Sequence, residues 1–226
     1  LTVEQSWFLA HALGAGSFPW VLAITAPYAE PAQRVAFETE RRQELLRLEV
    51  LREDGAVNPA VAQWITTTCR ARRWLELRFV TGSGAMLRGH VARRDGRLVV
   101  ALRSGRFVTF TELDVDHPHG LAPVVTAGLS RRTPAHFDEF SIPARIGAKA
   151  DERLRSGDSL DTVFDYVSIP ATARAVAVAA FSPDRAYVEI VAGDHRDGHR
   201  VSTDVGGSAA DTREGRLLVS PSNAFH

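Results

Sequence analysis

The sequence lacks several features on which common functions depend. Its 226 residues include one cysteine, Cys69, so no intrachain disulfide can form and a reducing compartment is the simpler setting. The longest apolar run, residues 18–24, is far too short to span a bilayer. Residues 1–16 carry Glu4 and no basic start, so they do not resemble a signal peptide.

The sequence also has no excess of charge of either sign. Its 27 basic and 27 acidic residues give a formal net charge of zero, so a nucleic acid or a membrane gains no general electrostatic attraction. Arginine pairs recur, but no aromatic residues alternate with them to form a stacking platform for bases. We therefore expect neither nucleic-acid binding nor membrane insertion. The 45% apolar and 24% charged residues suit a globular protein of one large or two small domains.

Helix signals dominate the first seventy residues. Thr2 with Gln5 three residues later predicts a capping box at the start of a first helix. Residues 18–25 are predicted to form a buried strand, and residues 31–52 a second helix that begins at a proline. An asparagine cap followed by proline predicts a third helix from residue 59.

The apolar periodicity then changes to two, as in β-strands. Asp95-Gly96 is a strong hairpin signal and Ser104-Gly105 is a weaker one. Consecutive hairpins join neighbouring strands antiparallel, so a meander is expected. Four strands are predicted, at residues 74–80, 86–94, 98–103 and 107–114.

The second half repeats this order of helices and strands. The strand sequence at residues 74–80 returns at 187–193, and residues 95–100 return at 214–219. We therefore predict an internal duplication, with half-repeats at residues 1–115 and 116–226. The second half is expected to contain helices at 116–129, 143–154, 159–167 and 170–181, and strands at 137–142, 186–193, 199–211 and 216–220.

The duplication also bears on the end of the chain. The first half continues past its Asp-Gly hairpin into a fourth strand, whereas the second half stops before an equivalent. A C-terminal strand or helix is therefore expected to be missing. The fold class is predicted to be α+β, with an antiparallel sheet and flanking helices.

Groups of residues that resemble a phosphate loop or a nucleophile have simpler explanations. In the segment Gly14-Ala15-Gly16-Ser17 the order is helix, loop, strand, and a phosphate loop needs the reverse. No Gly-x-Ser-x-Gly elbow occurs. Cys69 lies near arginines that would lower the pKa of a thiol, but a small buried apolar filler is the commoner role for such a cysteine.

Two turns are rich in metal-ligand residue types, and they carry the alternative function. A small metal-dependent enzyme would use one of these turns. Neither turn has helical His spacing or sulfur ligands, and both have ordinary turn chemistry. The leading prediction is therefore no catalysis, no metal and no cofactor. The residues are Asp114, Asp116, His117 and His119 in one turn, and Asp194, His195, Asp197 and His199 in the other.

Strand alternation separates the side chains of residues 186–193 into two sets. Val188 and Ile190 point to one face of the sheet and suit helices packed behind it. Tyr187, Glu189 and Val191 point to the other face, a mixture compatible either with a protein-binding surface or with a solvated sheet face. Glu76 occupies the position in the first half that matches Glu189.

Several longer segments resemble the EspG proteins of mycobacteria, and among these the members that serve the iron-linked ESX system. The similarity covers essentially the whole chain and its motifs are not of low complexity. The segments that carry it are LGAGSFPWVLAI (13–24), VNPAVA (57–62), RWLELR (73–78), FDEF (137–140), YVEIVAG (187–193) and LVSPS (218–222).

The resemblance implies a fold and a function. The family fold has two quasi-symmetric halves that share a central antiparallel sheet flanked by helical bundles, which agrees with the predicted duplication in a single domain over residues 1–226. EspG proteins are cytosolic chaperones of type VII (ESX) secretion. They bind PE–PPE heterodimers at the tip of the PPE protein, keep that apolar tip soluble and direct the substrates to their secretion system.

The resemblance also implies a partner surface on three parts of the fold: the central sheet, the loop between the family's second and third strands, which corresponds to residues 81–85 here, and the C-terminal helices. The residues expected to contact the PE–PPE heterodimer are Thr81, Gly82, Ser83, Gly84, Ala85, Tyr187, Glu189, Val191 and Ser208. A further interpretation is self-association as a weak homodimer, in which an open sheet edge pairs with a second copy.

Overall fold

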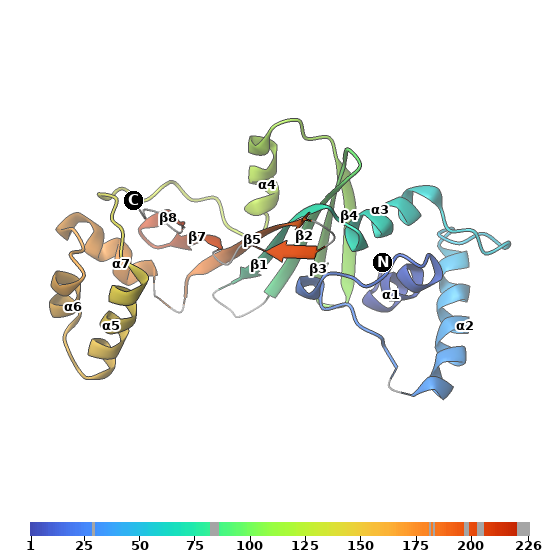
Figure 1. Ribbon diagram of the computed structural model, residues 1–226, viewed down its shortest axis with the longest axis horizontal. Helices are drawn as coiled ribbons and strands as arrows, with labels where there is room; N and C mark the ends of the chain where they lie inside the picture. Colours follow the sequence, from blue (N-terminus) through green and yellow to red (C-terminus); the bar gives the residue numbers. More distant parts are fainter. Residues whose placement is uncertain are drawn as a thin grey trace.

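The computed structural model describes residues 1–28, 30–81, 86–180, 182, 184–196, 199–202 and 206–220. A sheet occupies the middle of the molecule, with one group of helices from the first seventy residues at one end and a second group, within residues 144–180, at the other (Figure 1). All strand pairs are antiparallel. The predicted α+β class is confirmed.

Eight strands make up the sheet: β1 (Arg73–Val80), β2 (Met86–Arg94), β3 (Arg97–Ser104), β4 (Phe107–Leu113), β5 (Ala186–Arg196), β6 (His199–Ser202), β7 (Gly207–Thr212) and β8 (Gly215–Val219). Seven follow the order β4-β3-β2-β1-β5-β7-β8, and β6 pairs with the far end of β5. Asp95 and Gly96 have φ angles of 48° and 82°, the left-handed region that a two-residue hairpin requires. The predicted meander of four strands is therefore confirmed.

The N-terminal elements pack on one face of β2, β3 and β4. They are α1 (Val3–Ala12), the 3₁₀ turn η1 (Trp20–Leu22), α2 (Pro31–Arg47) and α3 (Pro59–Cys69). Their fully buried side chains include Leu9, Leu22 and Ile65, which form one core with Ala101 and Val108 of the sheet. Burial of an aliphatic side chain is worth about 1.5–3 kcal/mol, so this core fixes the helices on the sheet.

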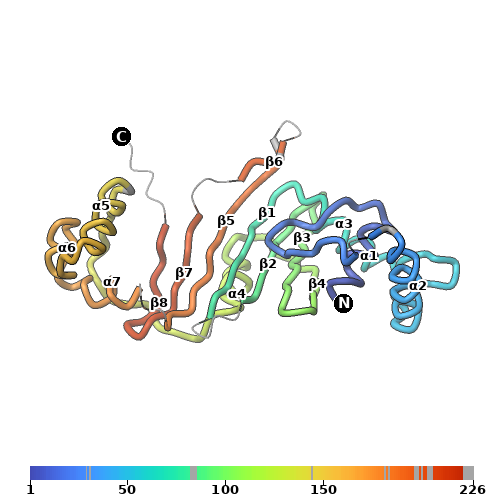
Figure 2. The backbone as a smooth tube through the Cα atoms, turned by 90° about the horizontal axis from the view of Figure 1, so that it is seen from below, coloured from blue at the N-terminus to red at the C-terminus, as the bar shows by residue number. Residues whose placement is uncertain are grey.

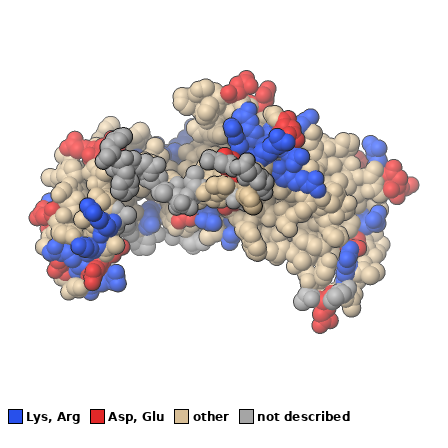
Figure 3. Space-filling view, in the orientation of Figure 1, with Lys and Arg blue, Asp and Glu red and all other residues tan. Residues whose placement is uncertain are grey.

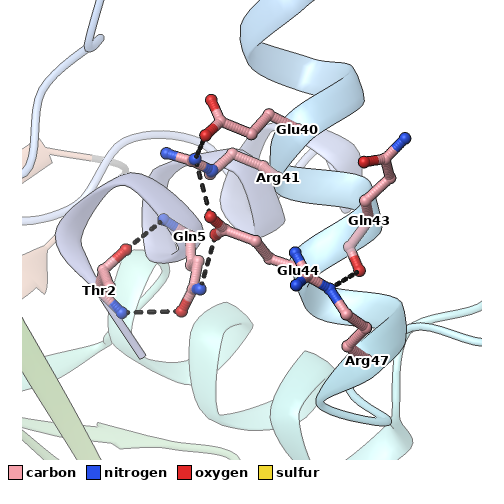
Figure 4. Close-up of polar contacts among 7 residues, drawn as sticks. All are labelled: Thr2, Gln5, Glu40, Arg41, Gln43, Glu44 and Arg47. Atoms are coloured by element: carbon pink, nitrogen blue, oxygen red, sulfur yellow. Dashed lines mark hydrogen bonds and ion pairs between the residues drawn. The ribbon is translucent and has the colours of Figure 1, made fainter.

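The predicted capping box at Thr2 and Gln5 is present, and it also links α1 to α2 (Figure 4). The Gln5 amide N–H donates to the Thr2 hydroxyl over 3.1 Å, and the Thr2 amide N–H donates to Gln5 Oε1 over 2.9 Å. Gln5 Nε2 then donates to Glu44 of α2, and Arg41 holds the other Glu44 oxygen. The cap of the first helix is thus joined to α2.

The opposite face of the sheet is covered by a short helical segment. It consists of η2 (Pro118–Leu121) and α4 (Ala122–Val125), which lies above the sheet in Figure 1. Leu77, Phe79 and Val188 are fully buried beneath it. Gly128 lies so close that a Cβ there would meet the Phe79 ring at 2.6 Å.

The C-terminal helices form the other end of the molecule. They are α5 (Ala144–Arg155), α6 (Leu160–Tyr166), the 3₁₀ turn η3 (Ala171–Ala173) and α7 (Arg174–Ala180). Ser159 caps α6 by accepting from the Thr162 amide, as its sequence predicts. α7 packs on the sheet through Val176, which is buried with Ala210 of β7 and Leu217 of β8.

Several predicted elements are wrong in type or length. Residues 18–25 form no strand but the η1 turn, and residues 137–142 form no strand either. The predicted strand at 199–211 is divided into β6 and β7, because these pair with different ends of β5. The helix expected at 31–52 ends at Arg47, and the one expected at 116–129 is reduced to η2 and α4.

The register of the central pair is compatible with the predicted duplication without testing it. β1 and β5 pair so that Leu77 lies opposite Ile190, the residue that matches Leu77 in the repeated sequence. The duplication, its boundaries at residues 115 and 116 and the missing C-terminal element remain predictions.

Gly193 provides a stability test of the sheet, because Trp74 occupies the space where a Cβ would lie. The two residues pair across β1 and β5, and a Cβ on Gly193 would stand 2.3 Å from the indole ring. Trp74 is buried and cannot move away freely. We expect Gly193→Ala to lower the free energy of unfolding by about 1–3 kcal/mol, measured by urea denaturation.

Gly147→Ala is the matched control for that substitution. Gly147 lies within α5, and its Cβ would meet only Ile142 at 3.9 Å. Alanine favours a helix over glycine by about 0.8–1 kcal/mol, so this variant should be as stable as the wild type or more so. Equal stability of Gly193→Ala and wild type would contradict the close packing of Trp74.

Candidate functional interface

Among the residues that the structure describes, no helix covers one face of the sheet in the stretch between the two groups of helices. Strands β1, β5, β7 and β8 lie side by side there, and Figure 2 looks onto this region. We call the exposed and half-buried side chains of these strands on this face the central strip. Trp74, Ala210 and Leu217 lie on the same face but are buried, so they are not part of it. The central strip comprises Glu76, Arg78, Val80, Tyr187, Glu189, Val191, Ser208 and Val219.

A single row of side chains crosses this face from the edge strand β8 to β3, the neighbour of the other edge strand. Directly paired residues of antiparallel strands point to the same face with Cβ atoms about 5 Å apart, so the pairing fixes the order of the row. From β8 to β3 the row is Val219, Ser208, Glu189, Arg78, Arg88 and Arg103.

The middle of the row is an ion pair. Arg78 Nη1 lies 3.6 Å from Glu189 Oε2, and the two side chains are 42% and 49% exposed. An exposed pair of this kind contributes about 0–1 kcal/mol to stability. The pair is therefore free to serve recognition without weakening the fold.

Helical elements flank the central strip on both sides. η1 lies against β1 and β2, and it is held by Arg88, which donates to the Val21 carbonyl over 3.3 Å. On the other side α7 packs on β7 and β8. Tyr187 lies at that border, where Arg185 stacks 4.8 Å from the centre of its ring. The strip thus forms the floor between two helical walls.

The residues predicted for partner binding come together where they are described. Tyr187, Glu189, Val191 and Ser208 all lie in the central strip, and Thr81 directly follows β1. Gly82, Ser83, Gly84 and Ala85 lie outside the described residues.

Other residues of the same face were not predicted from the sequence. Arg78 follows Glu76 at the interval of two that places both on one face, so strand alternation alone would have found it. Arg88 and Val219 enter through the pairing of β2 and of β8, which the sequence does not fix. Trp20, which lies in η1 beside the strip, was not predicted because its segment was expected to be a buried strand.

The competing sites find no support among the residues that are described. Gly14 and Ala15 present their carbonyls to the Arg70 guanidinium, as at a helix end. In the turn after β4, the backbone N–H of His119 donates to His117 Nδ1. Among the described residues, which do not include Asp197, no three His, Cys, Asp or Glu side chains gather into a metal-binding group.

Cys69 behaves as the predicted apolar filler. It is half-buried and packs against the N-terminal core. Burial raises the pKa of its thiol to about 12, and the nearby Arg70 guanidinium only partly opposes this effect. A thiol with such a pKa is almost wholly protonated at neutral pH and is a poor nucleophile.

Charges of both signs are interspersed on the visible surface of the two helical ends (Figure 3). The described helices include none that is both long and apolar enough to cross a membrane.

Comparison with known proteins finds relatives of this chain both by sequence and by fold. A model described as the EspG family matches residues 2–226. The whole chain is 56% identical to the ESX-3 secretion-associated protein EspG3 of Mycolicibacterium smegmatis and 53% identical to that of Mycobacterium tuberculosis, covering 77% and 81% of those proteins.

A solved structure has the same fold. It is that of the Mycobacterium tuberculosis type VII secretion system chaperone EspG5 in complex with a PE25–PPE41 dimer. The TM-score is 0.77 at 21% sequence identity, and the match covers 96% of this chain and 84% of that one. By the family match and by its identity to the EspG3 proteins, this chain belongs to the EspG family.

Proposed function

We propose that this chain is a cytosolic, non-enzymatic chaperone that binds a PE–PPE heterodimer, keeps it soluble and directs it to the ESX-3 secretion system. The observation that carries the proposal is the central strip, an open sheet face between two helical walls, in a fold shared with a chaperone solved with a PE–PPE dimer bound. The ESX-3 assignment rests on the EspG3 proteins, which are 53% and 56% identical.

The composition of the central strip suits a protein partner. Its tyrosine, valines and one Arg–Glu pair combine apolar area with a few polar groups, as in the cores of protein interfaces. We assign partner contact to Tyr187, Glu189, Val191 and Ser208, and to the segment that begins at Thr81. The same strip offers no enclosed group of nucleophile and base, which favours binding over catalysis.

The experiment is co-expression of this chain with a panel of defined mycobacterial PE–PPE heterodimers, PE25–PPE41 among them. We expect one heterodimer to co-purify as a one-to-one-to-one complex by size-exclusion chromatography with light scattering. The same heterodimer should remain soluble with the chain and aggregate without it. Failure of every heterodimer in the panel to form a stable complex would sink the proposal.

A further inference from the structure

Trp20 is the most exposed of the large apolar side chains that the structure describes. It is 85% exposed, although its neighbours Val21 and Leu22 are buried to 1% and 0%. Exposure of an isolated apolar residue is ordinary. A tryptophan is a different case, because it leaves a large apolar area in water and because tryptophan is enriched among the residues that dominate binding energy.

The turn that carries Trp20 is rigid. The Ala23 amide N–H donates to the Trp20 carbonyl, and Ala23 adopts a left-handed backbone with φ of 49°. A non-glycine residue in that region costs about 1–3 kcal/mol and persists only where its surroundings enforce it. The buried side chains of Val21 and Leu22 supply that enforcement from below.

Two arginines of the sheet hold the turn from the side of the central strip. Arg103 Nη1 donates to the Leu22 carbonyl over 2.8 Å and also to the Ala23 carbonyl, and Arg88 Nη1 donates to the Val21 carbonyl. Three arginines in adjacent positions of one row would repel each other. They are tolerated because the guanidinium groups of Arg88 and Arg103 donate hydrogen bonds to the η1 carbonyl oxygens, and because Arg78 pairs with Glu189.

The row therefore connects Trp20 to the proposed interface. It runs from Val219 through Glu189 and Arg78 to Arg88 and Arg103, and its last two members fix the Trp20 turn. Strands lie about 4.8 Å apart, so Arg88 is about 10 Å from Glu189. A helical protein that covers the central strip is broad enough to reach Trp20 as well.

From this continuity we infer that Trp20 is a preformed anchor that inserts into an apolar surface of the same PE–PPE heterodimer. The inference rests on the proposed function and extends it to a residue outside the sheet. Binding requires no ordering of its backbone, since the turn is already fixed, and such preorganisation helps one aromatic residue to dominate an interface.

The test is the affinity of Trp20→Ala for the PE–PPE heterodimer that co-purifies with the wild type. We expect the dissociation constant to rise about 30-fold or more, the effect of removing a dominant interface residue. The melting temperature should not change, because the side chain is 85% exposed. Phe107→Ala is the matched control: this aromatic residue is 59% exposed and lies on the opposite face of β4, where its loss should not affect affinity.

A spectroscopic readout separates direct contact from an indirect effect. The chain contains four tryptophans, so labelling it with 5-fluorotryptophan gives four ¹⁹F signals, and Trp20→Phe assigns the one from Trp20. In the free chain this signal should shift between H₂O and D₂O because the ring is exposed. On addition of the unlabelled heterodimer, that solvent shift should disappear.

The outcomes distinguish the inference from the proposed function. If the wild type binds the heterodimer but Trp20→Ala binds equally tightly, or if the Trp20 solvent shift survives in the complex, the anchor role is wrong and the chaperone function stands. If no heterodimer binds the wild type, both fail. If Trp20→Ala instead abolishes self-association in sedimentation at unchanged affinity, Trp20 contacts a second copy and the inference is overturned.

Discussion

Replacing Arg216 with alanine should lower the free energy of unfolding by about 3–5 kcal/mol, the cost of leaving one member of a buried ion pair alone. Arg216 forms two hydrogen bonds with Asp211, of 2.7 Å from Nε and 3.1 Å from Nη2, and the Asp211 side chain is 4% exposed. These bonds raise the pKa of Arg216, so its guanidinium stays charged across the working range of pH. Urea denaturation measures the loss.

Arg216 also fastens the segment that leads to the C-terminal helices. Its Nη2 donates to the Ser130 carbonyl, its backbone N–H donates to Thr133, and its carbonyl accepts from Ala135. Gly215 is needed beside it, because a Cβ there would lie 2.8 Å from both the Thr133 carbonyl and the Ala135 nitrogen. The guanidinium therefore serves both the β7–β8 hairpin and this crossing segment.

Three variants define the contribution of the pair. Arg216→Lys keeps the charge but cannot bridge both carboxylate oxygens and the carbonyl, so its loss should be intermediate. Arg216→Ala combined with Asp211→Ala removes the unpaired buried charge and should recover part of the stability. Arg213→Ala breaks only the exposed contact with Glu214 and should change stability by less than about 0.5 kcal/mol. If Arg216→Ala lost no more stability than Arg213→Ala, the proposed contribution of the Arg216–Asp211 pair would be contradicted.

Sequence alone predicted the parts of the fold that local chemistry decides. The helix caps at Thr2 and Ser159 and the hairpin at Asp95-Gly96 are confirmed, because each depends on a few neighbouring residues. The family resemblance is confirmed by the match over residues 2–226.

The main errors in the predicted secondary structure concern segments that are buried but do not pair with a strand. Residues 18–25 are apolar, but Val21 and Leu22 are buried in the core between the N-terminal helices and the sheet without pairing with any strand. Phe137 is similar: it packs with the C-terminal helices and forms no strand. An apolar run records that a segment is buried, and tertiary contacts decide its conformation.

The candidate interface was partly predictable for the same reason. Alternation along β5 placed Tyr187, Glu189 and Val191 on one face, and they lie together there. The partners of that face on other strands depend on register, which turns and packing set between distant segments. The row that joins Glu189 to Arg78 and Arg88 therefore became visible only in the structure.

Reversing the charge of Glu189 should weaken binding of the PE–PPE heterodimer about 100-fold or more while leaving the fold intact. Glu189→Arg removes the carboxylate that pairs with Arg78 and places a second cation directly beside it. A partner that covers the central strip and offers no carboxylate to the new arginine would then bury uncompensated charge, which costs about 3–5 kcal/mol. In the free chain the side chain is 49% exposed, so water screens the repulsion and stability should fall by less than about 1 kcal/mol. Isothermal titration calorimetry and urea denaturation measure the two effects.

A charge swap distinguishes a partner that only requires the ion pair to be neutral from one that recognises which strand carries the positive and which the negative charge. Arg78→Glu combined with Glu189→Arg restores an ion pair across β1 and β5 in the opposite orientation. Recovery of affinity would mean that the partner requires a neutralised strip, whereas continued loss would mean that it bonds to Glu189 or Arg78 individually. Glu40→Arg on α2, whose side chain is 65% exposed, is the matched reversal outside the strip and should bind like the wild type. If Glu189→Arg also binds like the wild type, the heterodimer does not cover the middle of the sheet, and the contact must lie on the helical walls.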